Sequence, residues 1–148
     1  MEITAKIITI LDRCKKEIQA AMAAGGVNAS GRTSASLKVE PYAGGVRLVS
    51  SGEKIAPFET LETGRKAGKV PFGFTAILVQ WSKDKGIGFS TESRRRSFAY
   101  LLGRKIKKEG TKRYKTPRND IYSPAVKEAV AAIKKEIQVH ISKAIKTN

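Results

Sequence analysis

Two long amphipathic segments, one near each end of the chain, constrain the fold more than any other feature. In the first, apolar residues recur every three or four positions, which is the spacing of one face of an α-helix. These residues are Ile3, Ile7, Leu11, Cys14, Ile18 and Met22. The same spacing recurs late in the chain at Val126, Val130, Ile133, Ile137, Ile141 and Ile145. Gly25 and Gly26 end the first segment, and Ser123 with Pro124 is a typical helix start. The sequence therefore predicts two long terminal helices.

Between these helices the pattern predicts a small sheet. Segments 36–40 and 46–50 alternate between apolar and polar residues, and the stretch 41–45 between them is rich in turn-forming residues. This is typical of an antiparallel hairpin. The polar stretch 27–33 before it is expected to be a loop.

Shorter helices are predicted in the middle of the chain. One should begin at Pro57 and end at Gly64. A second has an inner face marked by Phe74, Ile77, Leu78 and Trp81, and Gly86 and Gly88 terminate it. A third should be capped by Thr91 and turn inward Phe98, Leu101, Leu102 and Ile106. We therefore predict one α+β domain over residues 1–148, with long N- and C-terminal amphipathic helices and shorter middle helices packed on a small antiparallel sheet.

The charge of the chain indicates its kind of partner. Its 148 residues carry 29 Lys and Arg against 13 Asp and Glu, a net charge of +16. A protein so far from neutrality repels itself, so a polyanion such as nucleic acid or an anionic membrane is the expected partner. The membrane is disfavoured because no apolar run approaches the ~20 residues of a spanning helix. No secretory leader is visible, so we expect the protein in the cytosol or in particles assembled there.

The basic residues are concentrated rather than spread. Between positions 92 and 118 there are eleven basic and two acidic residues, a local balance of +9. The candidate contacts with DNA or with a protein neighbour come from a basic loop at 65–72, the start of the third middle helix, and a basic arm at 111–122. They are Arg65, Lys66, Lys69, Arg94, Arg95, Arg96, Lys112, Arg113, Lys115 and Arg118. The three consecutive arginines fan around their helix, so at least one should face inward or toward a partner. We expect the arm to be extended or poorly ordered, and ordered mainly by neighbours.

Residues that could carry chemistry are few. A single cysteine and a single histidine exclude a disulfide framework and most His-dependent catalytic or metal sites. Cys14 is interpreted as a buried small hydrophobe, and His140 as a residue at the edge of the core. Glu59 and Glu62 share a helix face and are interpreted as solvated surface.

The glycine-rich stretches do not form nucleotide sites. Gly64 and Gly68 are separated by three residues, where a phosphate-binding loop has four, and Val70 supplies no hydroxyl for magnesium. Gly86 and Gly88 lack a third glycine at the spacing of a dinucleotide fingerprint. The sequence therefore predicts no catalytic, cofactor or metal site, and a protein that is not an enzyme.

The order of segments resembles that of small head–tail joining proteins of tailed bacteriophages, a group of neck, tail-completion and tail-terminator proteins. The resemblance lies in the run APFETLETGR at 56–65, in GKVP at 68–71, in FAYLL at 98–102, and in Asp120-Ile121-Tyr122 ahead of the last helix. It implies a structural protein of the virion neck, assembled in the host cytoplasm as a six- or twelve-fold ring. Its partners would be further copies, a portal or adaptor protein, tail proteins, and genomic DNA passing through the lumen. No catalytic residues are implied.

Two functions therefore remain open at this stage. The first is a connector-ring subunit that joins portal to tail and works by assembly. The alternative is a stand-alone, sequence-nonspecific nucleic-acid-binding protein that uses the basic cluster at 94–118 on phosphates.

Overall fold

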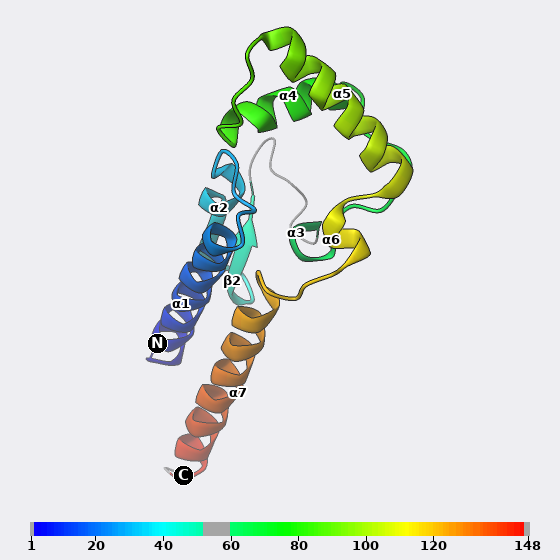
Figure 1. The fold of residues 1–148 in the computed structure, drawn as a ribbon. Helices are drawn as coiled ribbons and strands as arrows, with labels where there is room; N and C mark the ends of the chain where they lie inside the picture. The colour runs from blue at the N-terminus through cyan, green and yellow to red at the C-terminus, as the bar shows by residue number, and fades with distance from the viewer. Residues whose placement is uncertain (1, 52–59, 147–148) are drawn as a thin grey trace.

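The two terminal helices lie side by side and run in opposite directions. In the computed structural model, which describes residues 2–51 and 60–146, α1 spans Glu2–Ala24 and α7 spans Ser123–Lys146. The start of α1 and the end of α7 therefore lie at the same end of an elongated molecule (Figure 1). The prediction of a long helix at each end is confirmed.

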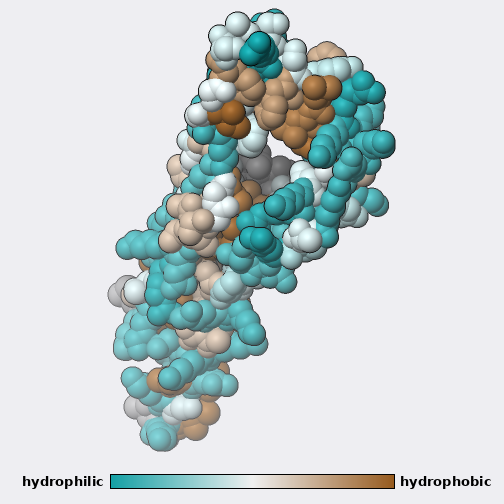
Figure 2. Space-filling view, in the orientation of Figure 1, coloured by the Kyte–Doolittle hydropathy of each residue, from teal (hydrophilic) through white to brown (hydrophobic). Residues whose placement is uncertain are grey.

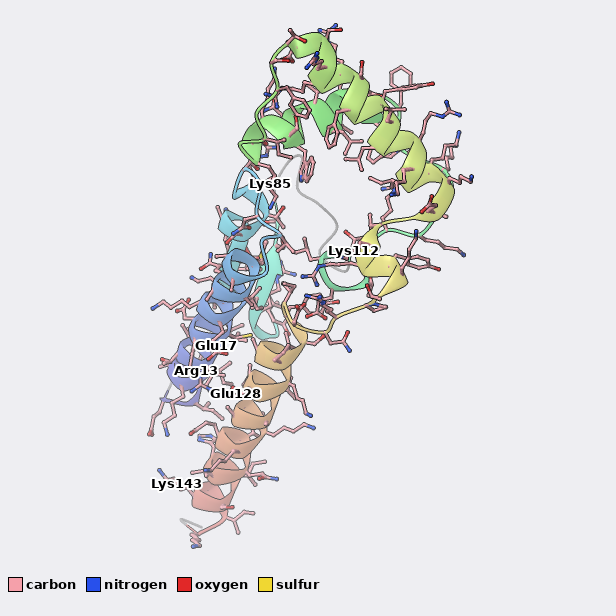
Figure 3. All side chains as sticks on the ribbon, in the orientation of Figure 1. Arg13, Glu17, Lys85, Lys112, Glu128 and Lys143 are labelled. Carbon is pink, nitrogen blue, oxygen red and sulfur yellow. The ribbon has the colours of Figure 1, made fainter. Side chains whose placement is uncertain are left out.

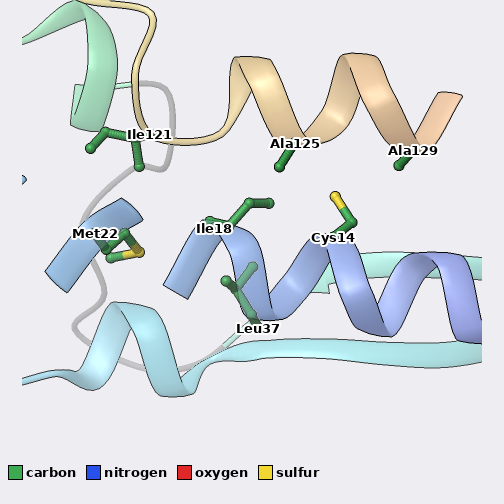
Figure 4. Packing of buried hydrophobic residues seen from close by; sticks show 7 residues of the cluster. All are labelled: Cys14, Ile18, Met22, Leu37, Ile121, Ala125 and Ala129. Atoms are coloured by element: carbon green, nitrogen blue, oxygen red, sulfur yellow. The ribbon is translucent and has the colours of Figure 1, made fainter. Parts of the chain in front are cut away.

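The face that α7 turns to α1 is built from small residues. Ala125 and Ala129 are buried in one cluster with Cys14 and Ile18 of α1, and their short side chains let the two helices approach closely (Figure 4). An amphipathic stripe normally faces the core. Here the stripe of larger residues is offset by one position, about 100° around the helix, and much of it is exposed: Val126, Val130, Ile137, Ile141 and Ile145.

The predicted hairpin is present and packs on α1. Strand β1 (Leu37–Tyr42) pairs antiparallel with β2 (Gly45–Ser50), with Leu37 opposite Ser50 and Tyr42 opposite Gly45. The strands run further into the expected turn than the sequence indicated, which leaves a two-residue connection. The short helix α2 (Arg32–Ala35) precedes β1 and begins inside the expected loop. The main helix contact of the sheet is with α1, and Leu37 joins the core there.

Helices α4 (Phe74–Asp84) and α5 (Glu92–Glu109) form a helical hairpin beyond the far end of α1 (Figure 1). The side chain of Thr91 accepts the backbone N–H of Arg94 and caps α5, as predicted. The small residues Ala99 and Gly103 are the buried ones on α5. Leu101, expected to face inward, is 62% exposed, because α4 packs against those small residues instead.

Two short helices join these parts. Helix α3 (Thr60–Thr63) contacts α6 (Lys112–Lys115), and both lie between the α1–α7 pair and the α4–α5 hairpin (Figure 1). The predicted start of a helix at Pro57 lies outside the described residues. The described elements form an α+β fold with a small antiparallel sheet, as the sequence predicted. The prediction that the middle helices pack on the sheet is wrong for α4 and α5, because these two helices pack mainly on each other.

Candidate polyanion-binding surface

Glu62 ties the start of α7 to α3. Its side chain is 1% exposed, and Oε1 accepts the backbone N–H groups of Ile121 at 2.9 Å and Ser123 at 2.7 Å, as well as that of Tyr122. Oε2 accepts the Ser123 hydroxyl. Burial raises the pKa of this carboxyl, but the hydrogen bonds from Ser123, Tyr122 and Ile121 outweigh it, and the pKa is lowered. The interpretation of Glu62 as solvated surface is therefore wrong. Glu59 lies outside the described residues.

Two glycines let the basic loop cross the start of the basic arm. A Cβ on Gly64, whose φ is +71°, would lie 2.3 Å from the backbone N of Tyr114, and a Cβ on Gly110 would lie 2.7 Å from the carbonyl O of Arg65. The crossing is fixed by Thr111, whose side-chain oxygen accepts the Arg65 N–H at 2.8 Å. The Thr111 N–H in turn donates to the Arg65 carbonyl at 2.9 Å. The structure thus brings together the loop and the arm, which the sequence treated as separate features.

The basic arm is folded onto the body rather than extended. Its first residues form α6, and Arg113 pairs with Asp120 at 2.8 Å. That ion pair lowers the pKa of Asp120. Ile121, near the end of the arm, is buried in the core. The expectation of an extended arm is therefore wrong at residues 112–115, which are helical, and Glu62 and the core hold the end of the arm within the chain. The expectation that neighbours order the arm stays a prediction.

Of the three consecutive arginines, one faces inward. Arg95 donates to the Ser82 Oγ at 2.9 Å and to the Ile87 carbonyl at 3.0 Å, and its guanidinium lies 4.9 Å from the centre of the Phe89 ring. Its side chain is 14% exposed. Arg94 and Arg96 on either side are exposed. Arg95 therefore holds the α4–α5 hairpin together, and only its two neighbours are free to meet a partner.

Arg65 is also held by its own chain. Its guanidinium lies 5.5 Å from the centre of the Phe74 ring, and Nη2 donates to the Lys69 carbonyl at 3.0 Å. Lys66 and Lys69 are exposed. The loop around them is bound to the end of α5, because the Gly68 N–H donates to the Lys107 carbonyl at 2.8 Å. The predicted loop is present, but Arg65 contacts Phe74 and Lys69 of its own chain rather than projecting toward a partner.

Almost every carboxylate that the structure describes is already engaged. Between α1 and α7, Arg13 bridges Glu17 and Glu128, and these three side chains point toward one another in Figure 3. Pairs with Lys or Arg also engage the remaining described acids except Glu62: Glu2, Asp12, Glu40, Asp84, Glu92, Glu109, Asp120 and Glu136. Hydrogen bonds from Lys83 and Lys115 lower the pKa of Glu92 and Glu109 respectively, so both stay ionised. Within residues 2–51 and 60–146, few carboxylates are therefore left to pair with the surplus cations.

We define the cationic surface by the exposed basic residues of α5, α6 and the following segment that pair with no carboxylate of the described chain. They are Arg94, Arg96, Arg104, Lys105, Lys107, Lys108, Lys112 and Arg118. In Figure 2 hydrophilic side chains line the margin of the molecule over α5 and α6. An exposed aromatic, Tyr100, lies among them with the Arg104 guanidinium 5.9 Å from its ring centre. Such a surface suits phosphates, and an exposed aromatic ring can stack on bases.

Four of these residues, Arg104, Lys105, Lys107 and Lys108, were not named individually as predicted contacts, although they lie within the basic cluster at 94–118. Lysines in the last turn of a helix also suit the dipole of that helix, so their position alone does not indicate a partner. The local charge of +9 was the signal that could have found them, because it counts them with the rest.

An open hollow of about 670 Å³ lies beside the cationic surface. Among the described residues its apolar lining comes from α4 and α5, and its basic rim from the end of α5 and from α6. The lining includes Leu78, Trp81, Leu102 and Ile106, and the rim Lys105, Lys112 and Lys115. Lys112 projects from α6 in Figure 3. The hollow adds apolar contact area next to the cations.

The other candidate residues lie elsewhere. Cys14 is 2% exposed, and burial, with Glu17 nearby, raises the pKa of its thiol, so its interpretation as a core residue is confirmed. His140 is exposed on α7, so its placement at the core edge is wrong. Within residues 2–51 and 60–146, no three potential metal ligands gather, and none of the helices has the length and apolar character to cross a bilayer.

Comparisons with known proteins found no matching protein-family model, curated protein or solved structure.

Proposed function

We propose that this chain is a structural subunit of a phage head–tail connector ring, which joins portal to tail and surrounds the DNA channel. The observation that carries the proposal is surface area. A compact monomer of 16.1 kDa is expected to expose roughly 7,400 Å². This chain exposes 10321 Å², a surplus of roughly 2,900 Å². Such a surplus is typical of a subunit seen without its neighbours.

The size of the surplus suits a ring. A subunit of a closed ring uses two different faces, one for each neighbour. Permanent interfaces bury about 2,000–5,000 Å² in total, or about 1,000–2,500 Å² on each partner. Two faces sharing the surplus would have about 1,450 Å² each, which falls inside that range.

The cationic surface supports a channel for DNA. Its cations form no ion pair with a carboxylate of the described chain, so a phosphate backbone would supply additional counter-charge. Contacts with phosphates carry no base identity, and a genome that moves through a ring must not be held by particular bases.

The alternative is a stand-alone nucleic-acid-binding protein. The observation that favours it is the same cationic surface, which needs no second copy in order to contact phosphates. Under this alternative the free monomer binds duplex DNA tightly at physiological salt, and the surplus of surface has no role.

The location of the chain tests the proposal. We would purify tailed particles from the strain that carries the gene and measure the copies of this chain per particle by quantitative mass spectrometry. The proposal predicts six or twelve copies, located at the head–tail junction by antibody labelling. Absence from the particles, together with tight binding of the free monomer to DNA, would reject the connector function and support the alternative.

A matched pair of variants then tests the cationic surface. Reversal of the exposed Arg94 and Arg96 to Glu should impair neck assembly or genome retention while the circular dichroism spectrum stays unchanged. The control reverses Lys16 and Lys38, two exposed cations in the α1–hairpin part of the chain, by the same total charge. Equal defects in both variants would show that net charge alone matters.

A further inference from the structure

One apolar face of α7 has no cover within the described chain. We call it the α7 stripe: Val126, Val130, Ile137, Ile141 and Ile145, which are 40, 45, 40, 52 and 71% exposed. The one extensive contact of α7 with another described element is with α1, and it uses the neighbouring line of small residues at Ala125 and Ala129. Brown residues are visible among hydrophilic ones at the foot of the molecule, where α7 ends (Figure 2). Five branched side chains are thus presented along one helix.

We propose that the α7 stripe is an interface between copies of this chain, an inference that rests on the proposed ring function and names the surface used. The first argument is area. One interface of a permanent assembly needs about 1,000–2,500 Å² on each partner, and the surplus surface of this chain is roughly 2,900 Å². The stripe runs from Val126 to Ile145, about 28 Å along the helix at 1.5 Å per residue, so it is long enough to be the apolar centre of one such interface.

The second argument is the rigidity of the stripe. All five residues are β-branched, and in a helix Val and Ile are held close to one side-chain rotamer. Burying them against a neighbour therefore costs little side-chain entropy. Their backbone is already fixed, because α7 is held along one side by α1 and at its start by Glu62.

Charge indicates which surface of the neighbour meets the stripe. Lys127 and Lys134 lie beside the stripe, and neither pairs with a carboxylate of the described chain. The cationic surface of the next copy would repel them. The α1–hairpin part carries seven basic and four acidic residues over positions 2–50, a balance of +3 compared with +9 over positions 92–118. The next copy therefore meets the α7 stripe with a face away from its own cationic surface, a head-to-tail contact of the kind that closes rings.

Salt should act on this interface in the opposite direction from its action on DNA binding. Copies that each carry +16 repel one another. Screening shortens the range of that repulsion from about 10 Å at 0.1 M salt to about 3 Å at 1 M. Apolar contacts are not weakened by this screening, so self-association should strengthen as salt rises. Binding to phosphates weakens as salt rises.

The experiment measures the mass of the full chain by sedimentation velocity at about 0.1 M and about 1 M sodium chloride. The variants are Ile141→Glu on the α7 stripe and, as a matched control, Leu101→Glu, which changes a leucine that is 62% exposed on α5. Wild-type protein should associate beyond the monomer at the higher salt. Ile141→Glu should raise the concentration needed for association by at least about tenfold, and Leu101→Glu should leave it unchanged. Melting temperatures check that both variants fold, and Ile145→Ser replaces Ile141→Glu if the latter does not.

Three results would overturn the inference. The first is that wild-type protein stays monomeric at the higher salt. The second is that Ile141→Glu associates like wild type. The third is that Ile141→Glu and Leu101→Glu lose self-association equally. Monomeric wild-type protein that binds phosphatidylglycerol vesicles through Ile141 would assign the stripe to a lipid surface instead. Failure here is distinguishable from failure of the proposed function, because the copy number in particles does not depend on which helix face is used.

Discussion

Replacing Glu62 by alanine removes the acceptor that four donors at the start of α7 share. The Ile121 N–H is fully buried, and leaving such a donor unsatisfied costs about 1–3 kcal/mol. Loss of the negative charge beside the first turn of α7 adds about 0.5–1 kcal/mol. With the Ser123 contacts also lost, we expect a total of about 3–5 kcal/mol. For a chain of this size the melting temperature should fall by roughly 6–20 °C.

Glu62→Gln separates charge from shape. Glutamine keeps the volume and one acceptor oxygen but removes the charge, so its cost should be about 1–2 kcal/mol. The control is Glu128→Ala on α7, which removes an exposed carboxylate paired with Arg13 and should leave the melting temperature nearly unchanged. Thermal melts followed by circular dichroism supply the numbers. If Glu62→Ala melts like the control, the carboxylate does not hold α7.

The same site predicts a pH dependence with a defined sign. The pKa of Glu62 is lower in the folded chain than in the unfolded chain, so the unfolded chain binds more protons in the window between the two values. The stabilisation is therefore complete above the ordinary pKa of about 4.3, and is lost as the pH falls through the folded value. The difference in stability between wild type and Glu62→Gln should be constant near neutral pH and shrink in acid. A difference that grows in acid would refute the assignment.

Three further outcomes follow from the geometry. Gly64→Ala should destabilise the chain by more than Gly86→Ala, as measured by urea unfolding. Both positions have positive φ, but only at Gly64 would a Cβ lie against neighbouring backbone. An equal loss of stability in the two variants would reject the close crossing at Gly64. Arg95→Met should cost about 1–3 kcal/mol in the same assay through its lost contacts with Ser82 and Ile87, while Arg94→Met should cost almost nothing. Binding to unrelated DNA duplexes, measured by fluorescence anisotropy, should weaken with salt along one common slope, and a hundredfold preference for one sequence would contradict phosphate-only contact.

The regular elements could be predicted because their causes are local. Apolar spacing, the Thr91 cap and the glycine after α4 depend on residues within a few positions of one another, and so does the alternation in the hairpin. The inward arginine was partly predictable as well. Three successive arginines cannot all face water on a packed helix, but the sequence does not say that Arg95 is the one that Ser82 accepts.

The contacts that organise the candidate site could not be predicted, because they join distant segments. Glu62 and Ile121 are 59 positions apart, and nothing near Glu62 in the sequence distinguishes a buried cap from a solvated acid. The crossing at Gly64 and Gly110 could not be predicted for the same reason. In the sequence, a glycine before a basic loop is equally well explained as the residue that ends a helix.

The exposure of the stripe on α7 could not be predicted from the sequence for a different reason. Helical spacing identifies an apolar face but not what covers it. The alanines beside the stripe proved to be the face that α1 uses, because small residues allow the closer approach. The larger residues are exposed and have no cover among the described residues.

We propose that the chain functions as a subunit of a ring around DNA. Electron cryomicroscopy of the tailed particles, averaged at the head–tail junction, tests it most directly. We predict a closed ring of six or twelve copies into which the α1–α7 pair and the α4–α5 hairpin fit, with the α7 stripe buried between neighbours and DNA density in the lumen. A junction without this chain, in particles from the strain that expresses it, would reject the connector function.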